Sequence, residues 1–207
     1  MPYVEPRVNP KNKNVEPLFK VLSVDLSNPS NSKEILNAQS LALTHRQQIN
    51  EQIKKIAAQL NIDYAGKRPL FIAILNGSFM FASDLFKELT IDAEICFIKL
   101  ASYKGTKSTG NVITSIGLDI PLTDRHVIIV EDIVDTGKTL HAFLPQLINQ
   151  QPVTLKIASL LHKPEALQFP VTIDYLGFEV PNKFLLGYGL DYDGLGRNLK
   201  EIYRLVE

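Results

Sequence analysis

Residues 127–140 read VIIVEDIVDTGKTL. The first four residues are β-branched and apolar, which is typical of a buried strand, and two carboxylates, Glu131 and Asp132, follow them directly. A small polar turn that contains a glycine then opens an apolar helical segment. Parallel sheets bind ligands at the carboxyl ends of their strands, and a helix N-terminus offers free N–H groups to an anion. The stretch therefore predicts an α/β fold with a phosphate site at this strand end.

The residues Gly-Lys-Thr at 137–139 also end the Walker P-loop, but Asp132 stands where that motif has its first glycine. A triphosphate loop needs a concave run of N–H donors, and two carboxylates would repel its ligand. Carboxylates instead accept hydrogen bonds from sugar hydroxyls, or hold Mg²⁺ together with a substrate's phosphate oxygens. The pattern thus indicates a ribose 5-phosphate. A solvated acidic turn that closes a Rossmann-like strand is the alternative.

The order of strand, Glu-Asp, two aliphatic residues and Asp-Thr-Gly-Lys-Thr resembles the phosphoribosyl diphosphate site of the type I phosphoribosyltransferases, and its wording is similar to the hypoxanthine-guanine branch. The resemblance covers about residues 65–205. It implies that Glu131 and Asp132 hold the ribose hydroxyls and that Asp135 lies beside purine N7 as general base or acid. The implied ribose and phosphate contacts are Glu131, Asp132, Asp135, Thr136, Gly137, Lys138 and Thr139.

The resemblance implies a reaction as well. The 5-phosphoribosyl group would pass from phosphoribosyl diphosphate to N9 of a 6-oxopurine, hypoxanthine or guanine, which gives IMP or GMP and pyrophosphate in purine salvage. Mg²⁺ is the implied cofactor, with Glu131, Asp132 and Asp191 as its ligands. Further copies of the chain, in a homodimer or homotetramer, are the implied protein partners.

The strand at 70–75 ends in Asn76-Gly77-Ser78, a second small polar turn before a helix, although a plain βα turn would look similar. In the family this loop grips pyrophosphate and often contains a cis bond between non-proline residues, which would here join Leu75 to Asn76. Many members have a lysine at the position of Asn76, and its absence here leaves the contact to backbone donors. The implied pyrophosphate contacts are Leu75, Asn76, Gly77 and Arg197.

Residues 102–116 are polar, contain two glycines, and show no helix or strand period before Val112. A loop of this length is usually functional, and glycosyl transfer needs a mobile cover that excludes water. Ser102 and Tyr103 match the Ser-Tyr pair of the family's flexible loop, which implies a lid. A long hairpin connection is the alternative.

Lys163 follows the strand predicted at 155–161, and residues 177–193 place aromatic side chains in a loop. By themselves these features fit a surface lysine and an edge of the core. The resemblance instead implies a purine-binding hood, in which Lys163 donates to O6, Phe184 stacks on the base and Leu185 meets the purine edge through its backbone. Asp191 completes the implied purine set. A donor that faces position 6 favours a 6-oxopurine over adenine.

Apolar periodicity predicts the other elements. Helices are expected at 38–60, 77–89 and 138–148, and strands at 70–75, 94–101, 127–130, 155–161 and 173–178. Pro145 predicts a kink in the third helix. The succession indicates a Rossmann-like α/β domain, with a mostly parallel sheet and a small hood over its carboxyl edge. We divide this single domain into an N-terminal arm (1–35), a core (36–170) and a hood (171–207).

Composition narrows the partners. The 207 residues contain 22 Lys and Arg and 22 Asp and Glu, so no net positive field attracts nucleic acid or an acidic membrane. The competing function class, a nucleotide-sensing regulator of the same fold that binds RNA or DNA, would need a basic face. Neither a transmembrane run nor a signal peptide is recognisable. The single cysteine, Cys96, cannot form an internal disulfide and suits a reducing cytoplasm.

Overall fold

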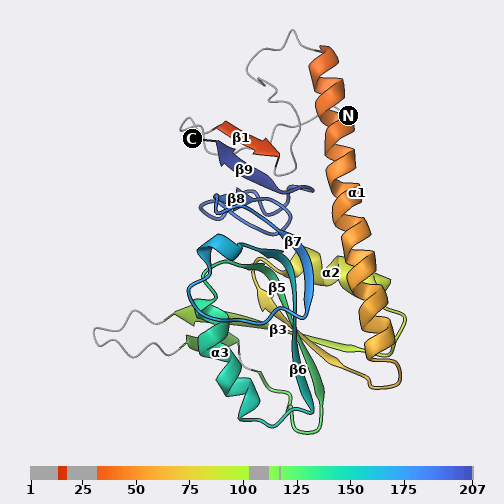
Figure 1. Cartoon of the computed structure of the whole chain (residues 1–207), viewed down its shortest axis with the longest axis vertical. Helices are drawn as coiled ribbons and strands as arrows, with labels where there is room; N and C mark the ends of the chain where they lie inside the picture. The colour runs from red at the N-terminus through yellow and green to blue at the C-terminus, as the bar shows by residue number, and fades with distance from the viewer. Residues whose placement is uncertain (1–13, 18–31, 103–111, 117, 207) are drawn as a thin grey trace, which may run out of the picture. The chain divides into compact units, whose positions relative to one another are not determined.

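The computed structural model describes residues 14–17, 32–102, 112–116 and 118–206 (Figure 1). The chain divides into two compact units by the contacts within each. The core unit is Ile53–Asn182, and the terminal unit combines residues 1–52 with residues 183–207. Helix α1 (Ser32–Asp63) contributes residues to both units.

A six-stranded sheet with the order β4-β3-β2-β5-β6-β7 forms the centre of the core unit. Five strands run parallel, and β4 is antiparallel to β3 at one edge. Helix α2 (Phe79–Glu88) links β2 to β3, and α3 (Lys138–Ile148) links β5 to β6. The predicted α/β class with a mostly parallel sheet is thus confirmed. The strands are β2 (Leu70–Leu75), β3 (Glu94–Ser102), β4 (Val112–Ile116), β5 (His126–Val134), β6 (Thr154–His162) and β7 (Tyr175–Glu179).

The sheet has a switch point between β2 and β5. These strands are neighbours, yet the chain continues from β2 to β3 on one side and from β5 to β6 on the other. Their register ends at Ala73 and Val130, beyond which β2 stays paired with β3 and β5 with β6. The two strands therefore part at their carboxyl ends. Open α/β sheets bind their ligands at such points.

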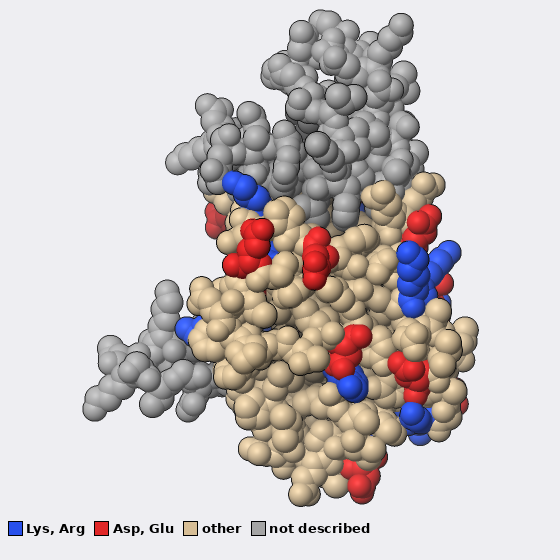
Figure 2. All heavy atoms as spheres, in the orientation of Figure 1, with Lys and Arg blue, Asp and Glu red and all other residues tan. Residues whose placement is uncertain are grey.

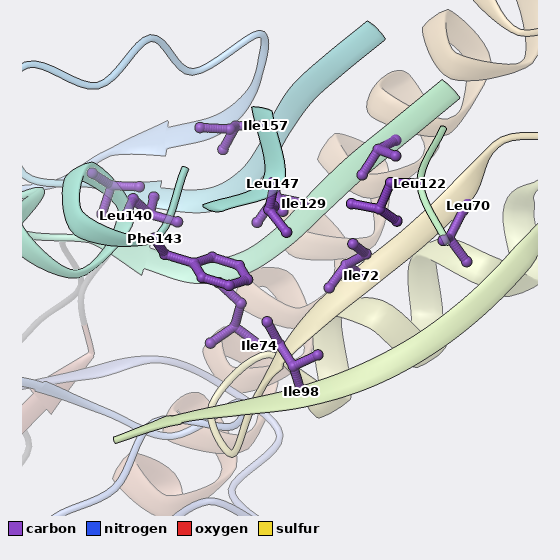
Figure 3. Packing of buried hydrophobic residues seen from close by; sticks show 12 residues of the cluster. Leu70, Ile72, Ile74, Ile98, Leu122, Ile129, Leu140, Phe143, Leu147 and Ile157 are labelled. Carbon is purple, nitrogen blue, oxygen red and sulfur yellow. The ribbon is translucent and has the colours of Figure 1, made fainter. Parts of the chain in front are cut away.

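Both faces of the sheet are covered. Leu70, Ile72 and Ile74 of β2 point to one face, where they pack with Phe143 and Leu147 of α3 (Figure 3). The intervening residues of β2 point to the other face, since side chains alternate along a strand. There the ring of Phe71 meets Phe86 of α2 edge-on, with 5.4 Å between centroids. Burial on both faces explains why these strands read as continuous apolar runs.

Strand β5 is longer than the sequence predicts. We expected it to end at Val130, but it runs to Val134, so Glu131 and Asp132 lie inside the strand rather than in a turn. The reason is that β5 keeps its parallel pairing with β6 after β2 has diverged. Both acids are consequently held on a fixed backbone.

The polar segment 102–116 contains a strand that the sequence prediction missed. Val112–Ile116 forms β4, which pairs antiparallel with the end of β3. The intervening residues 103–111, including Tyr103, lie outside the described residues, and of Ser102 only the backbone is described. The lid therefore stays a prediction.

The terminal unit contains a small antiparallel sheet with the order β1-β9-β8. Its strands are β1 (Asn14–Pro17), β8 (Leu185–Leu186) and β9 (Tyr203–Val206). The predicted arm and the C-terminal segment are thus paired through β1 and β9, while residues 1–13 and 18–31 of the arm lie outside the described residues. Helix α1 begins at Ser32, inside the predicted arm, and β7, inside the predicted hood range, belongs to the core sheet.

Two further features of the described residues concern the single cysteine and the character of the helices. Cys96 is half-buried against the core cluster, and burial raises the pKa of its thiol to about 11, which disfavours a role as nucleophile. The described helices include none with the length and apolar character needed to cross a membrane.

Candidate functional site

Glu131 and Asp132 lie where β2 and β5 part. The Oε2 atom of Glu131 is buried and has no hydrogen-bond partner. Burial, and next the neighbouring charge of Asp132, raise the pKa of Glu131 well above its usual range. A buried carboxylate oxygen without a donor is costly, and native proteins keep few of them. A ligand hydroxyl or a cation would supply the missing partner.

The turn after β2 passes directly against Asp132. A Cβ atom built on Gly77 would overlap the Asp132 carboxylate, so a glycine permits this close approach. The peptide bond between Leu75 and Asn76 is cis, as the resemblance implies. The buried hydroxyl of Ser78 closes the turn by donating to a carbonyl oxygen four residues earlier, at 2.6 Å. The acid pair and this turn therefore line the same strand ends.

The turn after β5 leads into α3. Gly137 precedes the helix with φ at 76°, and a Cβ atom there would overlap the carbonyl oxygen of Phe169. The carbonyl oxygen of Thr136 accepts hydrogen bonds from two backbone N–H groups, those of Gln168 and Phe169, both at 3.0 Å. Gly137 has no side chain to cap the helix, but the Thr136 hydroxyl oxygen accepts a hydrogen bond from the backbone N–H of Lys138 at 3.4 Å. The turn is thus fixed by its surroundings, and the start of α3 offers backbone donors suited to an anion.

Lys163 and Asp135 form an ion pair across the ends of β5 and β6. The Lys163 Nζ atom donates to Asp135 Oδ2 at 2.8 Å, with the lysine side chain 9% exposed and the aspartate 45% exposed. The backbone N–H of Lys163 donates to the carbonyl oxygen of Val134 at 2.9 Å, which fixes its position. The sequence analysis assigned both residues to the purine but did not foresee their contact, because a separation of 28 residues leaves no periodic signal.

The chemistry of this pair suits one edge of a purine. A 6-oxopurine presents O6 and N7 as neighbouring acceptors on the same edge. A lysine donates to O6, and a carboxyl group beside it exchanges a proton at N7. Two side chains within hydrogen-bond distance of each other can meet both atoms of that edge.

Four of the predicted residues belong to the terminal unit: Phe184, Leu185, Asp191 and Arg197. Leu185 is buried in β8, whereas Phe184 is 45% exposed. The Phe184 ring meets Tyr192 edge-on, with 5.5 Å between centroids. An exposed ring held by an aromatic neighbour is able to stack on a base.

Asp191 and Arg197 bind each other within the terminal unit. The guanidinium also donates to the carbonyl oxygen of Gly189 at 2.7 Å, and the backbone N–H of Gly194 donates to the Asp191 carboxylate at 2.8 Å. Their assigned contacts to metal and pyrophosphate stay predictions. The core unit, taken by itself, brings together Leu75, Asn76 and Gly77 with the residues from 131 to 139 and Lys163.

The described residues include no group of three or more His, Cys, Asp or Glu side chains arranged to hold a metal ion. Mg²⁺ seldom needs such a group, because it is usually bound through one or two carboxylates and the phosphate oxygens of a substrate. The unpaired oxygen of Glu131, next to Asp132, fits that mode of binding.

Charge on the visible face is mixed. Figure 2 shows described Lys and Arg side chains lying close to acidic ones instead of forming a continuous basic patch. In the core unit, Arg68 and Arg125 both pair with Glu94, and Lys156 pairs with Asp174. Among these residues the positive charges are therefore partly balanced by neighbouring carboxylates.

The chain is similar to known proteins over most of its length. The family model described as "Phosphoribosyl transferase domain" matches residues 39–193. The hypoxanthine-guanine-xanthine phosphoribosyltransferase of Tritrichomonas foetus is 40% identical over 166 residues, which cover 80% of this chain and 91% of that protein. The hypoxanthine-guanine phosphoribosyltransferase of Streptococcus pneumoniae is 41% identical over 167 residues, covering 80% of this chain and 92% of that protein.

Solved structures give the same result. The crystal structure of a hypoxanthine-guanine phosphoribosyltransferase from Bacillus anthracis matches with a TM-score of 0.73 and 39% identity, over 78% of this chain and 95% of that chain. A hypoxanthine phosphoribosyltransferase from Staphylococcus aureus matches with a TM-score of 0.74 and 38% identity, over 78% of this chain and 88% of that chain.

Proposed function

The chain belongs to the phosphoribosyltransferase family, and we propose from this that it transfers the 5-phosphoribosyl group of phosphoribosyl diphosphate to N9 of hypoxanthine or guanine. The products are IMP or GMP and pyrophosphate, as in purine salvage. The observation that carries the proposal is the acid pair Glu131 and Asp132 at the switch point between β2 and β5. The turn after β5, which leads into the N-terminus of α3, follows this pair. This arrangement supplies acceptors for a sugar and donors for its phosphate.

Phosphoribosyl diphosphate binds at the carboxyl end of β5, at the turn that follows β5 and at the turn that follows β2. Glu131 and Asp132 accept hydrogen bonds from the ribose hydroxyls, which satisfies the buried oxygen of Glu131. The backbone and side chains of residues 135–139 hold the 5-phosphate. Backbone donors of residues 75–77 contact pyrophosphate, and Arg197 is the further contact that the resemblance implies.

Mg²⁺ is the proposed cofactor, with Glu131, Asp132 and Asp191 as the residues that would hold it. When bound, the ion acts as a Lewis acid that stabilises negative charge on the leaving pyrophosphate. Ser102 and Tyr103 are the proposed lid residues, which exclude water while the sugar carries positive charge.

Asp135 is the proposed general base. N9 of the purine attacks C1 of the ribose as pyrophosphate leaves. The purine then loses its proton at N7, and the Asp135 carboxylate accepts that proton. Lys163 donates to O6 and so orients the purine. The assignment of Phe184, Leu185 and Asp191 to the purine rests on the resemblance of their segment.

Product formation from radiolabelled phosphoribosyl diphosphate tests the function. Each of hypoxanthine, guanine, xanthine and adenine is supplied with Mg²⁺ and, separately, with excess chelator. We expect labelled IMP and GMP in the presence of Mg²⁺ and no labelled AMP, because Lys163 faces an amino group in adenine. Turnover of adenine alone, or no turnover together with RNA binding in a low-salt filter assay, would contradict the proposal.

We also propose a cytoplasmic location and a homodimer or homotetramer. The single cysteine, which cannot form an internal disulfide, fits a reducing compartment, and the resemblance implies that copies of the chain associate. Light scattering at several protein concentrations tests the assembly, and a mass of one chain throughout would exclude it.

A further inference from the structure

The turn proposed for pyrophosphate has no positive charge of its own. Residues 69–86, which include β2, the turn and most of α2, contain neither Lys nor Arg. The side chain packed against the turn at Gly77 is a carboxylate, that of Asp132. Pyrophosphate bound here would meet backbone donors and an acid, so its charge calls for a cation from another element.

The register of the sheet places Lys99 beside this turn. Strand β3 pairs in parallel with β2, and the final pair is Leu75 with Lys99. Neighbouring strands lie about 4.8 Å apart, so Lys99 is one strand spacing from the residue that opens the cis bond. Lys99 is exposed, although Ile98 before it is fully buried.

The direction of the Lys99 side chain follows from the alternation of β2. Ile74 points to the α3 face of the sheet, so Leu75 points to the opposite face, which α2 covers through its contact with Phe71. Residues that pair in register share a face, and Lys99 therefore points to the α2 face. The turn enters α2 on that face.

A break in strand pairing occurs at the same position. Lys99 pairs with Ile116 and Leu100 with Thr114, so β4 carries one extra residue and the register shifts between Lys99 and Leu100. Bulges bend a strand and re-aim side chains, and they are frequent beside binding sites. This irregularity is independent of the charge argument and lies beside Lys99, although the extra residue belongs to β4 and not to β3.

We propose that Lys99 binds the pyrophosphate group of phosphoribosyl diphosphate and of the product, and that it supplies the charge which the turn after β2 lacks. This inference rests on the proposed function and adds a substrate-binding residue to it. The ammonium group is a compact charge with three donors, which suits phosphate oxygens that shift during departure.

Steady-state kinetics of Lys99→Met and Lys99→Arg test the inference. Methionine keeps the length of the side chain and removes its charge, so KM for phosphoribosyl diphosphate and the inhibition constant of pyrophosphate should both rise about tenfold, the scale of one charged hydrogen bond. KM for hypoxanthine should not change, and arginine should restore most of the affinity. Lys87→Met is the matched control, because Lys87 pairs with Asp84 on the surface of α2.

A second variant separates a charge effect from a fold effect. In the Lys99→Met background, Asn76→Lys places a cation in the turn itself and should recover part of the lost affinity for phosphoribosyl diphosphate. The unfolding midpoints of all variants show whether each keeps its fold. If Lys99→Met does not, Lys99→Gln is tested in its place.

A direct binding measurement tests the role of Lys99 separately from the proposed function, because it does not require turnover. Calorimetry with inorganic pyrophosphate and Mg²⁺ should give a weaker Kd for Lys99→Met than for the unmodified chain. Equal Kd values, or an unchanged KM for phosphoribosyl diphosphate, overturn the role of Lys99. An unmodified chain that makes no nucleotide overturns the proposed function instead.

Discussion

Asp135 illustrates how one contact constrains a mechanism. Its carboxylate is half-exposed and is held by the nearly buried Lys163, so it is both accessible and oriented. The asparagine in Asp135→Asn keeps the shape and an oxygen for Lys163 but cannot accept a proton. We expect kcat to fall tens-fold or more, the range for general acid–base catalysis, with small changes in either KM.

Asp174→Asn is the control for this prediction. Asp174 also pairs with a lysine, Lys156, at 2.7 Å, but it accepts a backbone hydrogen bond of β6 and has no proposed role in the reaction. Its kcat should stay near that of the unmodified chain. If Asp135→Asn kept full kcat, Asp135 would not be the base.

Glu131 should make the ligand-free protein less stable as the pH rises. Burial and the neighbouring Asp132 raise the pKa of Glu131 in the folded state, so between the unfolded value of about 4.3 and the raised folded value the folded state binds more protons. The free energy of unfolding therefore falls as pH rises through this window and levels off above it. Glu131→Gln should remove this contribution.

Urea unfolding between pH 5 and pH 8 measures the effect. At neutral pH we expect Glu131→Gln to be more stable than the unmodified chain, by about 1.4 kcal/mol for each unit by which the folded-state pKa of Glu131 is raised, up to the pH of the measurement, because the amide carries no charge to bury. The same variant should bind phosphoribosyl diphosphate more weakly, since the amide cannot accept hydrogen bonds as a carboxylate does. Equal pH profiles for the two proteins would show that the charge on Glu131 is not costly.

Two glycines with similar φ angles allow the cost of a left-handed backbone to be distinguished from the cost of a steric overlap. Gly66 and Gly137 have φ values of 71° and 76°, but a Cβ atom meets nothing within 4 Å at Gly66 and overlaps the carbonyl oxygen of Phe169 at Gly137. Gly66→Ala should cost about 1 kcal/mol from the left-handed conformation alone. Gly137→Ala should cost clearly more and also weaken 5-phosphate binding, as urea midpoints and KM for phosphoribosyl diphosphate would reveal. Equal losses would mean that the turn after β5 adjusts freely.

The predicted elements agree with the structure where hydrophobic periodicity is strong. The strand at 70–75 and the helix at 138–148 have their predicted bounds, since each is a long apolar pattern between clear turns. The sequence analysis missed β4 and β8, and it also missed β1 and β9, which pair with each other. These strands are short, and antiparallel pairing with another strand creates them, across almost the whole chain in the case of β1 and β9.

The site was predictable in part. The acid pair and the two glycine turns could be read because local order along one strand and its loop determines them. The approach of Gly77 to Asp132 and the pairing of Lys163 with Asp135 could not, because the sheet brings together residues from different strands. For the same reason the place of Lys99 followed only from the register of β2 and β3.

Helix α3 tests the cost of an internal proline. Pro145 is exposed, lies inside the helix and lacks the N–H group that would bond the preceding turn, yet the helix continues to Ile148. Pro145→Ala should restore this hydrogen bond, and the gain should be about 1 kcal/mol or more after allowance for the freer unfolded chain. Urea midpoints measure it, with Gln146→Ala as the exposed neighbour control. A loss of stability on Pro145→Ala would indicate that α3 depends on the proline for its path.

Mg²⁺ should not affect the stability of the ligand-free protein, although the reaction requires it. The described residues include no preformed group of three acidic, histidine or cysteine ligands, so Mg²⁺ should enter with phosphoribosyl diphosphate and not before it. A cation that binds neither the folded nor the unfolded chain leaves stability unchanged. Excess chelator should therefore abolish nucleotide formation while the thermal midpoint of the ligand-free protein stays the same. With phosphoribosyl diphosphate present, Mg²⁺ should raise that midpoint, and Asp132→Asn should reduce the increase. A midpoint that falls on chelation without substrate would point instead to a structural metal, held by residues that the proposed site does not include.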